Sequence, residues 1–91
     1  MLEVRCIQKK DLIILNYINN NPRFSSIMIH NNIDLSIDIV RSRLYKLQRF
    51  NLIEIRKMRI NNKITTVYEI NENGLNIIKC FNYLNLLEQN N

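Results

Sequence analysis

The chain has 91 residues, too few for two independent hydrophobic cores, so the sequence predicts one domain over residues 1–91. With 46% hydrophobic and 23% charged residues its composition is that of an ordinary globular protein, and its longest apolar run, Leu12–Leu15, is far too short to cross a membrane. The net charge is +5, and no basic-then-apolar leader stands at the N-terminus, so we expect a cytoplasmic protein without membrane contact.

The first third of the chain predicts two helices. In residues 8–20 apolar side chains recur on one helical face, and Pro22 stops this helix. Ser25 or Ser26 can then cap a short second helix that continues to about Asn32.

A third helix, over about residues 37–50, carries two separate sets of side chains, and Ser36 is its candidate N-cap. Steps of three and four positions give an apolar stripe that predicts a core-facing side, namely Ile37, Val40, Leu44 and Leu47. Basic and hydroxyl-bearing residues occupy the other side, without an acid from position 41 to 49, and they are Arg41, Ser42, Tyr45, Lys46 and Arg49. Such a side suits a DNA groove, since Arg can bind guanine or phosphate and hydroxyls can reach phosphates or base edges. Asp38, in the first turn, either caps the helix or accepts from a cytosine amino group.

The excess positive charge lies in one stretch of the chain. Residues 41–63 contain eight Lys or Arg residues against one acid, Glu54, whereas the remainder contains five against seven acids. A solvated surface would mix both signs, so this segregation indicates a polyanionic partner.

From residue 52 onward the pattern changes from helical to extended. Two segments rich in β-branched residues, 52–59 and 64–70, are separated by Asn61-Asn62, and Asn tolerates a positive φ better than other non-glycine residues. These features predict a β-hairpin with an Asn-rich tip. Asn71 can then cap a final helix through about Glu88, which completes the order helix, helix, helix, strand, strand, helix in a mainly α fold with one hairpin.

The final helix is apolar nearly all round. One side can serve the domain's own core, but so small a domain cannot cover the other side, which implies a partner surface. A symmetric homodimer is the simplest solution, and a loosely packed or frayed helix is the alternative. Residues 7–70 would form the core and residues 71–88 a dimerisation helix. The candidate interface residues are Leu75, Ile78, Phe81, Leu84 and Leu87.

Residues 35–57, LSIDIVRSRLYKLQRFNLIEIRK, resemble the recognition helix and first wing strand of winged helix-turn-helix proteins. Their pattern is a Leu-Ser cap, a helix with two spaced leucines, and Gly-Leu-Ile; Leu44 and Leu47 are the leucines here, and Asn51 stands at the glycine position. Residues 66–74, TVYEINENG, resemble the exit Tyr-x-(Ile/Leu)-Thr-x-x-Gly of the MarR and PadR groups, with Asn71 at the Thr position. The likeness covers residues 7–88. The size and the Asn and Ile content are also similar to those of small winged-helix proteins from viruses and plasmids of thermophilic archaea.

This resemblance implies a dimeric transcriptional regulator that binds double-stranded DNA sequence-specifically. The helix 36–50 would enter the major groove, and the wing, residues 57–63, would contact the minor groove or the flanking backbone. Ser25 and Ser26 either present a helix N-terminus to a phosphate or only cap the helix. The alternative function is a winged-helix module that binds protein or RNA. The candidate DNA-binding residues are Ser25, Ser26, Ser36, Arg41, Ser42, Tyr45, Lys46, Arg49, Lys57, Arg59, Asn61, Asn62 and Lys63.

Three residues depart from the winged-helix pattern. His30 stands where a small residue is usual, so we expect it to point outward or to fill a gap. Asp34 and Asn51 stand at glycine positions, and both residue types can enter the left-handed region at modest cost.

Neither a metal site, a cofactor nor enzymatic activity is expected. Cys6 and Cys80 lack a nearby second Cys or His, which excludes a paired-ligand zinc site; they are either small buried residues or partners in a disulfide, within a chain or between subunits. Ser26, His30 and Asp34 mimic a hydrolytic triad by spacing, but the outer two fall at helix ends and no oxyanion loop is near. The sequence does not indicate a small-molecule effector.

Overall fold

The computed structural model describes the backbone of residues 7–89 and the side chains of residues 7–82. The elements are three helices, a hairpin and a last helix, in the predicted order. They are α1 (Lys9–Asn20), α2 (Ser26–Asn32), α3 (Ile37–Arg49), β1 (Ile53–Ile60), β2 (Lys63–Ile70) and α4 (Glu72–Gln89). The predicted fold class is therefore confirmed.

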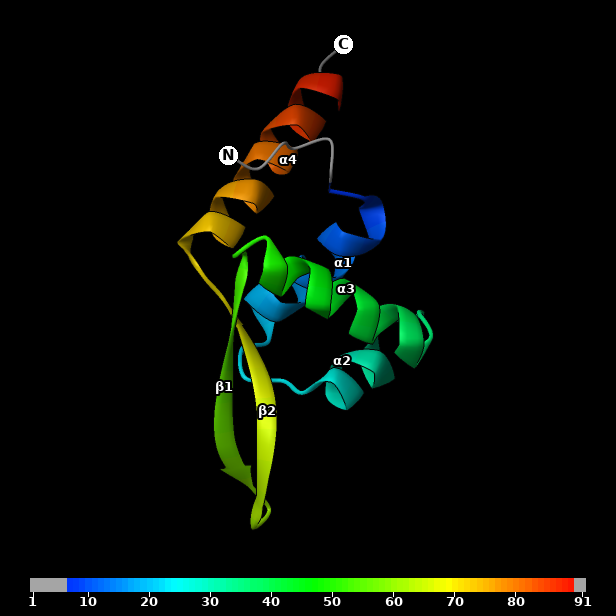
Figure 1. The fold of residues 1–91 in the computed structure, drawn as a ribbon. Helices are drawn as coiled ribbons and strands as arrows, with labels where there is room; N and C mark the ends of the chain where they lie inside the picture. Colours follow the sequence, from blue (N-terminus) through cyan, green and yellow to red (C-terminus); the bar gives the residue numbers. More distant parts are fainter. Residues whose placement is uncertain (1–6, 90–91) are drawn as a thin grey trace.

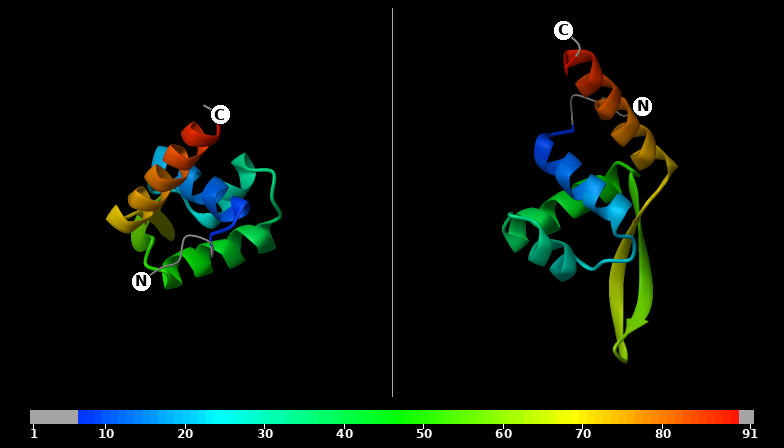
Figure 2. Two further views of the ribbon diagram at one scale, coloured as in Figure 1. Left: turned by 90° about the horizontal axis from the view of Figure 1, so that it is seen from above. Right: turned by 180° about the vertical axis from the view of Figure 1, so that it is seen from behind.

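The first three helices form a body from which the hairpin projects on one side and α4 on the other (Figure 1). Helix α1 lies centrally, because it contacts α2, α3, α4 and β2 (Figure 2). The two strands pair antiparallel, with Ile53 opposite Ile70 at the root and Ile60 opposite Lys63 at the tip. No helix in the described part of the chain is long and apolar enough to cross a membrane.

The core forms where the apolar stripes of the helices meet. Val40, Leu44 and Leu47 of α3 are buried as predicted, whereas Ile37, at the start of the same stripe, is only half-buried. Val40, Leu44 and Leu47 pack in one cluster with Ile14 and other apolar residues of α1, α2 and β1.

Three of the predicted caps are confirmed. The Ser25 hydroxyl oxygen accepts from the Met28 amide at 3.3 Å. In the same way, the Ser36 hydroxyl oxygen accepts from the Ile39 amide at 3.2 Å. The Asn71 side chain accepts from the Gly74 amide at 2.9 Å, so a polar side chain begins each of these helices.

The asparagines serve as turn residues. Asn61 and Asn62 have φ values of 51° and 66°, as a tight hairpin turn requires, and Asn51 has 58°. Asp34 does not adopt a positive φ. In the same connection the His30 Nδ1 atom lies 2.8 Å from the Leu35 carbonyl oxygen. A carbonyl only accepts, so Nδ1 carries the proton. His30 thus fills a gap in the connection between α2 and α3, which is the second of the two expectations for this residue.

Gly74 allows α4 to approach the root of the hairpin closely. A Cβ atom at this position would lie 2.6 Å from the Ile70 side chain and would overlap the Leu52 carbonyl oxygen. Any larger residue must therefore displace the start of α4.

Part of the surface of α4 that was predicted to contact a partner packs against the protein's own core instead. Ile78 is only 8% exposed and joins the core, so its assignment to a dimer interface is wrong. Phe81 is half-buried against the same core, and Leu75 is also half-buried. Cys80 is exposed, which contradicts the first of the two expectations for it, a small buried residue; the disulfide with Cys6 stays a prediction. Cys6 and the side chains of Leu84 and Leu87 lie outside the described residues.

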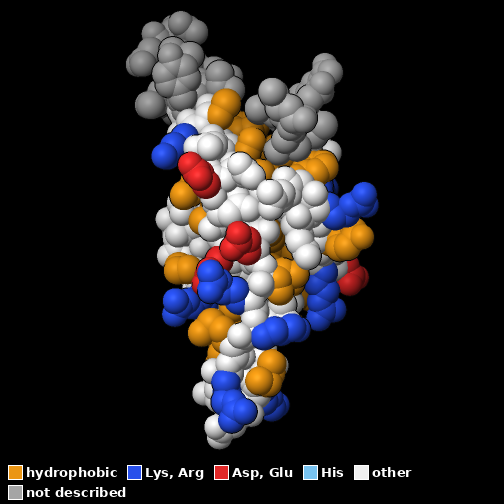
Figure 3. All heavy atoms as spheres, turned by 60° about the vertical axis from the view of Figure 1, so that its left-hand side comes forward, with side chains coloured by type: hydrophobic (Ala, Val, Ile, Leu, Met, Phe, Trp, Pro, Cys, Tyr) orange, Lys and Arg blue, Asp and Glu red, His pale blue; other side chains and the backbone are white. Residues whose placement is uncertain are grey.

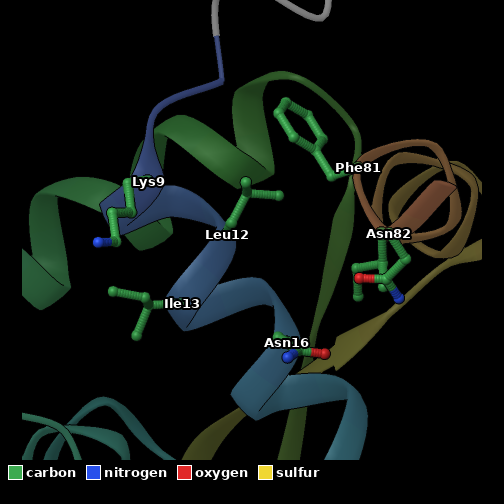
Figure 4. A pocket seen from close by; sticks show the side chains of 7 residues that line it. Lys9, Leu12, Ile13, Asn16, Phe81 and Asn82 are labelled. Carbon is green, nitrogen blue, oxygen red and sulfur yellow. The ribbon is translucent and has the colours of Figure 1, made fainter. Parts of the chain in front are cut away.

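A shallow hollow of about 180 Å³ lies between the surfaces of α1 and α4 (Figure 4). Leu12 and Ile13 of α1 and Phe81 of α4 give it apolar walls, and Ile13 is 41% exposed. The hollow shows that α1 contributes apolar surface beside α4.

Candidate nucleic-acid interface

The outer side of α3 is exposed and basic. Arg41, Ser42, Tyr45 and Arg49 all point away from the core, and Tyr45 is 62% exposed. The Arg49 guanidinium lies 5.8 Å from the centre of the Tyr45 ring, so cation and ring stack on the surface. Asp38 is exposed at the start of the same side.

Two other cations of α3 face inward, and one of them is a predicted DNA-binding residue. The Lys46 ammonium lies 2.6 Å from a carboxylate oxygen of Asp11, which is fully buried in α1. Arg43 lies 3.5 Å from the other oxygen and also donates to the Gln8 side chain. Asp11 further accepts from the Gln8 amide at 2.9 Å. Lys46 therefore ties α3 to α1, which corrects our placement of this residue on the outer side.

The hairpin presents exposed basic and polar residues at and near its tip. All five residues predicted there are exposed, and they are Lys57, Arg59, Asn61, Asn62 and Lys63. They do not share one side, because the register places Lys57 and Arg59 on one face and Lys63, opposite Ile60, on the other. Figure 3 shows basic side chains along the projecting hairpin with apolar side chains exposed among them.

Tyr68 lies half-buried near the root of the hairpin. Its cross-strand partner is Ile55, so Tyr68 lies on the same face of the hairpin as Lys57 and Arg59. Burial raises the pKa of Tyr68 above its usual value, and the nearby positive charge of Arg41 opposes that rise. The positive charge of Arg41 on α3 therefore acts at the root of the face that carries Lys57 and Arg59.

The acid at the root of the hairpin, Glu69, is paired away from this face. The Glu69 carboxylate lies 2.8 Å from Arg56 and 3.3 Å from Arg23, on the other face of the hairpin. Among the described residues, Arg41, Arg49, Lys57, Arg59 and Lys63 form no ion pair. Their positive charge is therefore available to an external anion.

The predicted serines are near but not within the basic surface. The oxygens of Ser25 and Ser36 already accept from backbone amides, so only their hydroxyl protons can serve a phosphate. Ser26 is half-buried in the first turn of α2. The described residues contain no cluster of His, Cys, Asp or Glu suited to a metal ion.

Solved structures share this arrangement of helices and hairpin. A MarR-family transcription regulator superposes with a TM-score of 0.81 at 17% identity, over 91% of this chain and 54% of that one. FabT from Streptococcus pneumoniae in complex with DNA gives 0.72 at 15% identity, over 92% and 58%. The MepR–DNA complex from S. aureus gives 0.74 at 16% identity, over 94% and 63%. The chain has the winged helix-turn-helix fold of MarR-family regulators.

The chain spans a little over half the length of these solved chains. No protein-family model matches the sequence, and no characterised protein matches it either. The narrower resemblance to archaeal viral and plasmid proteins stays a prediction. In this fold α3 occupies the position of the recognition helix, and the hairpin occupies the position of the wing.

Sequence analysis missed Asp11 and Tyr68. Asp11 follows Ile7 by four positions and precedes Ile14 by three, so it occupies the buried stripe of α1. An acid inside an apolar stripe signals a buried partner, although the sequence does not say which. Tyr68 stood inside the quoted wing-exit motif, but the motif gave no sign that this side chain would be half-buried within reach of the charge of Arg41.

Proposed function

We propose that this protein binds double-stranded DNA sequence-specifically as a homodimer and regulates transcription. The recognition helix α3 enters the major groove with Arg41, Ser42, Tyr45 and Arg49. The wing places Lys57, Arg59, Asn61, Asn62 and Lys63 on the minor groove or the flanking backbone. Ser25, Ser26 and Ser36 donate their hydroxyl protons to phosphates.

The observation that carries this proposal is the set of unpaired cations on two adjoining elements. Arg41 and Arg49 extend from the outer side of α3, and Lys57, Arg59 and Lys63 extend from the wing, all exposed. Of the acids around these cations, Asp11 and Glu69 are bound to other cations, and Asp38 is exposed at the start of α3. A duplex has a regular array of phosphates to which such a surface is complementary. Two similar structures, FabT and MepR, are complexes with DNA.

The homodimer rests on apolar surface at the opposite end of the molecule. Leu75 and Phe81 of α4 are half-buried, and Ile13 of α1 beside them is 41% exposed. Residues 71–88 would form the dimerisation helix, with Leu84 and Leu87 continuing the sequence pattern. A two-fold dimer would bind a pseudo-palindrome with half-sites about one helical turn, roughly 10 bp, apart.

The test is selection of bound duplexes from a random pool, followed by a salt titration of the selected duplex. The logarithm of the binding constant should fall linearly with the logarithm of salt concentration, with a slope of about −0.9 per phosphate contact. Sedimentation should give a dimer, and the selected site should be two-fold symmetric. Absence of duplex binding at low salt, or preference for RNA, would refute the proposal. A monomer on one asymmetric half-site would refute the dimer alone.

A further inference from the structure

Ile64 is the most exposed large apolar side chain described on the wing. It is 68% exposed, and it stands on β2 two positions after the turn residue Asn62. Its cross-strand partner is Arg59, so an apolar side chain and a guanidinium stand together on one face. Lys57, whose ammonium donates to the Thr66 hydroxyl at 2.6 Å, lies next to them on that face.

This face points toward DNA if the proposed function holds. It is the face on which the register groups the exposed cations Lys57 and Arg59 with Ile64. The stretch from Ile55 to Tyr68 contains no acid. The positive charge around Ile64 therefore complements a phosphate-lined groove, whereas Ile64 itself gains nothing from phosphate.

The dimensions allow Ile64 to enter the minor groove. Val67 is the last fully buried residue on β2, and Ile64 lies three residues further out. At about 3.3 Å per residue the side chain stands roughly 10 Å beyond the body. The minor groove is about 6 Å wide and 7.5 Å deep, so a hairpin tip can place one side chain against its floor.

We propose that Ile64 packs against the floor of the minor groove and makes the wing prefer base pairs without an exposed amino group there. The inference rests on the proposed function and names the part of the duplex that the wing recognises. An A·T pair presents only acceptors in the minor groove, whereas G·C adds the guanine N2 amino donor. An apolar side chain pressed against that donor leaves it without a partner, which costs free energy. Arg59 and Lys57 then bind the phosphates on either side.

Inosine separates this effect from recognition in the major groove. A duplex of alternating dI and dC presents the same major-groove groups as one of alternating dG and dC, but it lacks the minor-groove amino group. Each wing of the wild-type protein should favour the inosine duplex about five- to tenfold, in line with the cost of one unpaired donor.

The matched variants are Ile64→Thr and Met58→Thr. Threonine keeps the β-branched shape that suits a strand and supplies a hydroxyl that can accept from the guanine amino group. Met58 belongs to the same hairpin but lies on the opposite face, paired with Thr65. Ile64→Thr should bring the two affinities within about twofold, without changing the salt slope, and Met58→Thr should keep the wild-type preference. Thermal unfolding of both variants checks that the wing is intact.

Each outcome decides between distinct conclusions. If wild-type protein binds neither duplex at low salt, the proposed function fails and the inference fails with it. If it binds both but Ile64→Thr behaves like Met58→Thr, DNA binding stands and the role of Ile64 is wrong. An apolar tip among cations also suits an anionic membrane surface. Loss of binding to phosphatidylserine vesicles in Ile64→Thr, with duplex binding unchanged, would overturn the proposal in favour of that surface.

Discussion

The recognition helix and the wing carry similar positive charge but hold it differently. In α3 two of the cations, Arg43 and Lys46, bind the buried carboxylate of Asp11, and only Arg41 and Arg49 face solvent. In the wing, Lys57 and Arg59 are exposed and have no acidic partner among the described residues. A count of basic residues treats all six alike. The structure separates those that fix the helix from those that can bind a ligand.

The difference has a physical origin in where each element sits. Helix α3 packs on α1, so a cation on its inner flank is partly removed from water and needs a counter-charge. The wing projects from the body and remains hydrated, so its cations need no partner (Figure 1). Loss of the ion pairs at α3 should therefore lower the stability of the fold, whereas loss of a cation from the wing should lower the affinity for DNA.

The largest effect is expected from Asp11→Asn. The substitution keeps the shape but leaves Lys46 and Arg43 without their counter-charge at a fully buried site. Loss of one partner from a buried ionic cluster costs about 3 kcal/mol, which for a domain of this size lowers Tm by roughly 10–20 °C. Thermal unfolding at fixed protein concentration measures it. Asp38→Asn, an exposed acid on α3, is the control and should leave Tm nearly unchanged. Equal shifts would show that Asp11 does not anchor α3.

Substitution of Arg41 should change which sequences are bound more than how tightly DNA is bound in general. Arg41→Gln removes a candidate base contact from the exposed side of α3, and loss of one such contact relaxes discrimination by about 1–3 kcal/mol. Competition between the selected site and single-base variants measures this change. Tyr45→Phe, which removes only a hydroxyl from the same side, should have a smaller effect. If Arg41→Gln weakens every duplex equally, Arg41 contacts the backbone instead.

The sequence could predict which residues of α3 and of the hairpin face outward, because this depends on local patterns. The stripe of Val40, Leu44 and Leu47 fixes which side of α3 is outer, and the cap Ser36 fixes where the helix begins. The Asn61-Asn62 turn sets the register of the hairpin.

The pairing of α3 with α1 could not be predicted, because it joins distant parts of the chain. Lys46 and Asp11 are 35 positions apart, and helical periodicity alone places Lys46 on the flank between core and solvent. Ile78 was misassigned for a similar reason: a helix that is apolar nearly all round does not reveal which side meets its own core.

A smaller effect is expected from Lys63→Gln in the wing. This residue is exposed at the tip, so its removal should leave Tm unchanged. If Lys63 binds a phosphate, the slope of log affinity against log salt should fall by about one unit per protomer, and all duplexes should be weakened alike. Lys79→Gln, an exposed cation on α4, is the matched control. An unchanged slope in Lys63→Gln would remove this residue from the DNA surface.

The smallest effect is expected from Asn62→Gly, which tests the geometry of the wing without touching its charge. Asn62 has a φ of 66°, a conformation that glycine adopts without strain and asparagine at a modest cost. Glycine should therefore stabilise the fold by about 0.5 kcal/mol, and Asn62→Ala should destabilise it by about 1 kcal/mol. Chemical denaturation measures both. If Asn62 only shapes the turn, Asn62→Gly should bind DNA as the wild type does; weaker binding despite a more stable fold would mean that the asparagine side chain itself contacts the duplex.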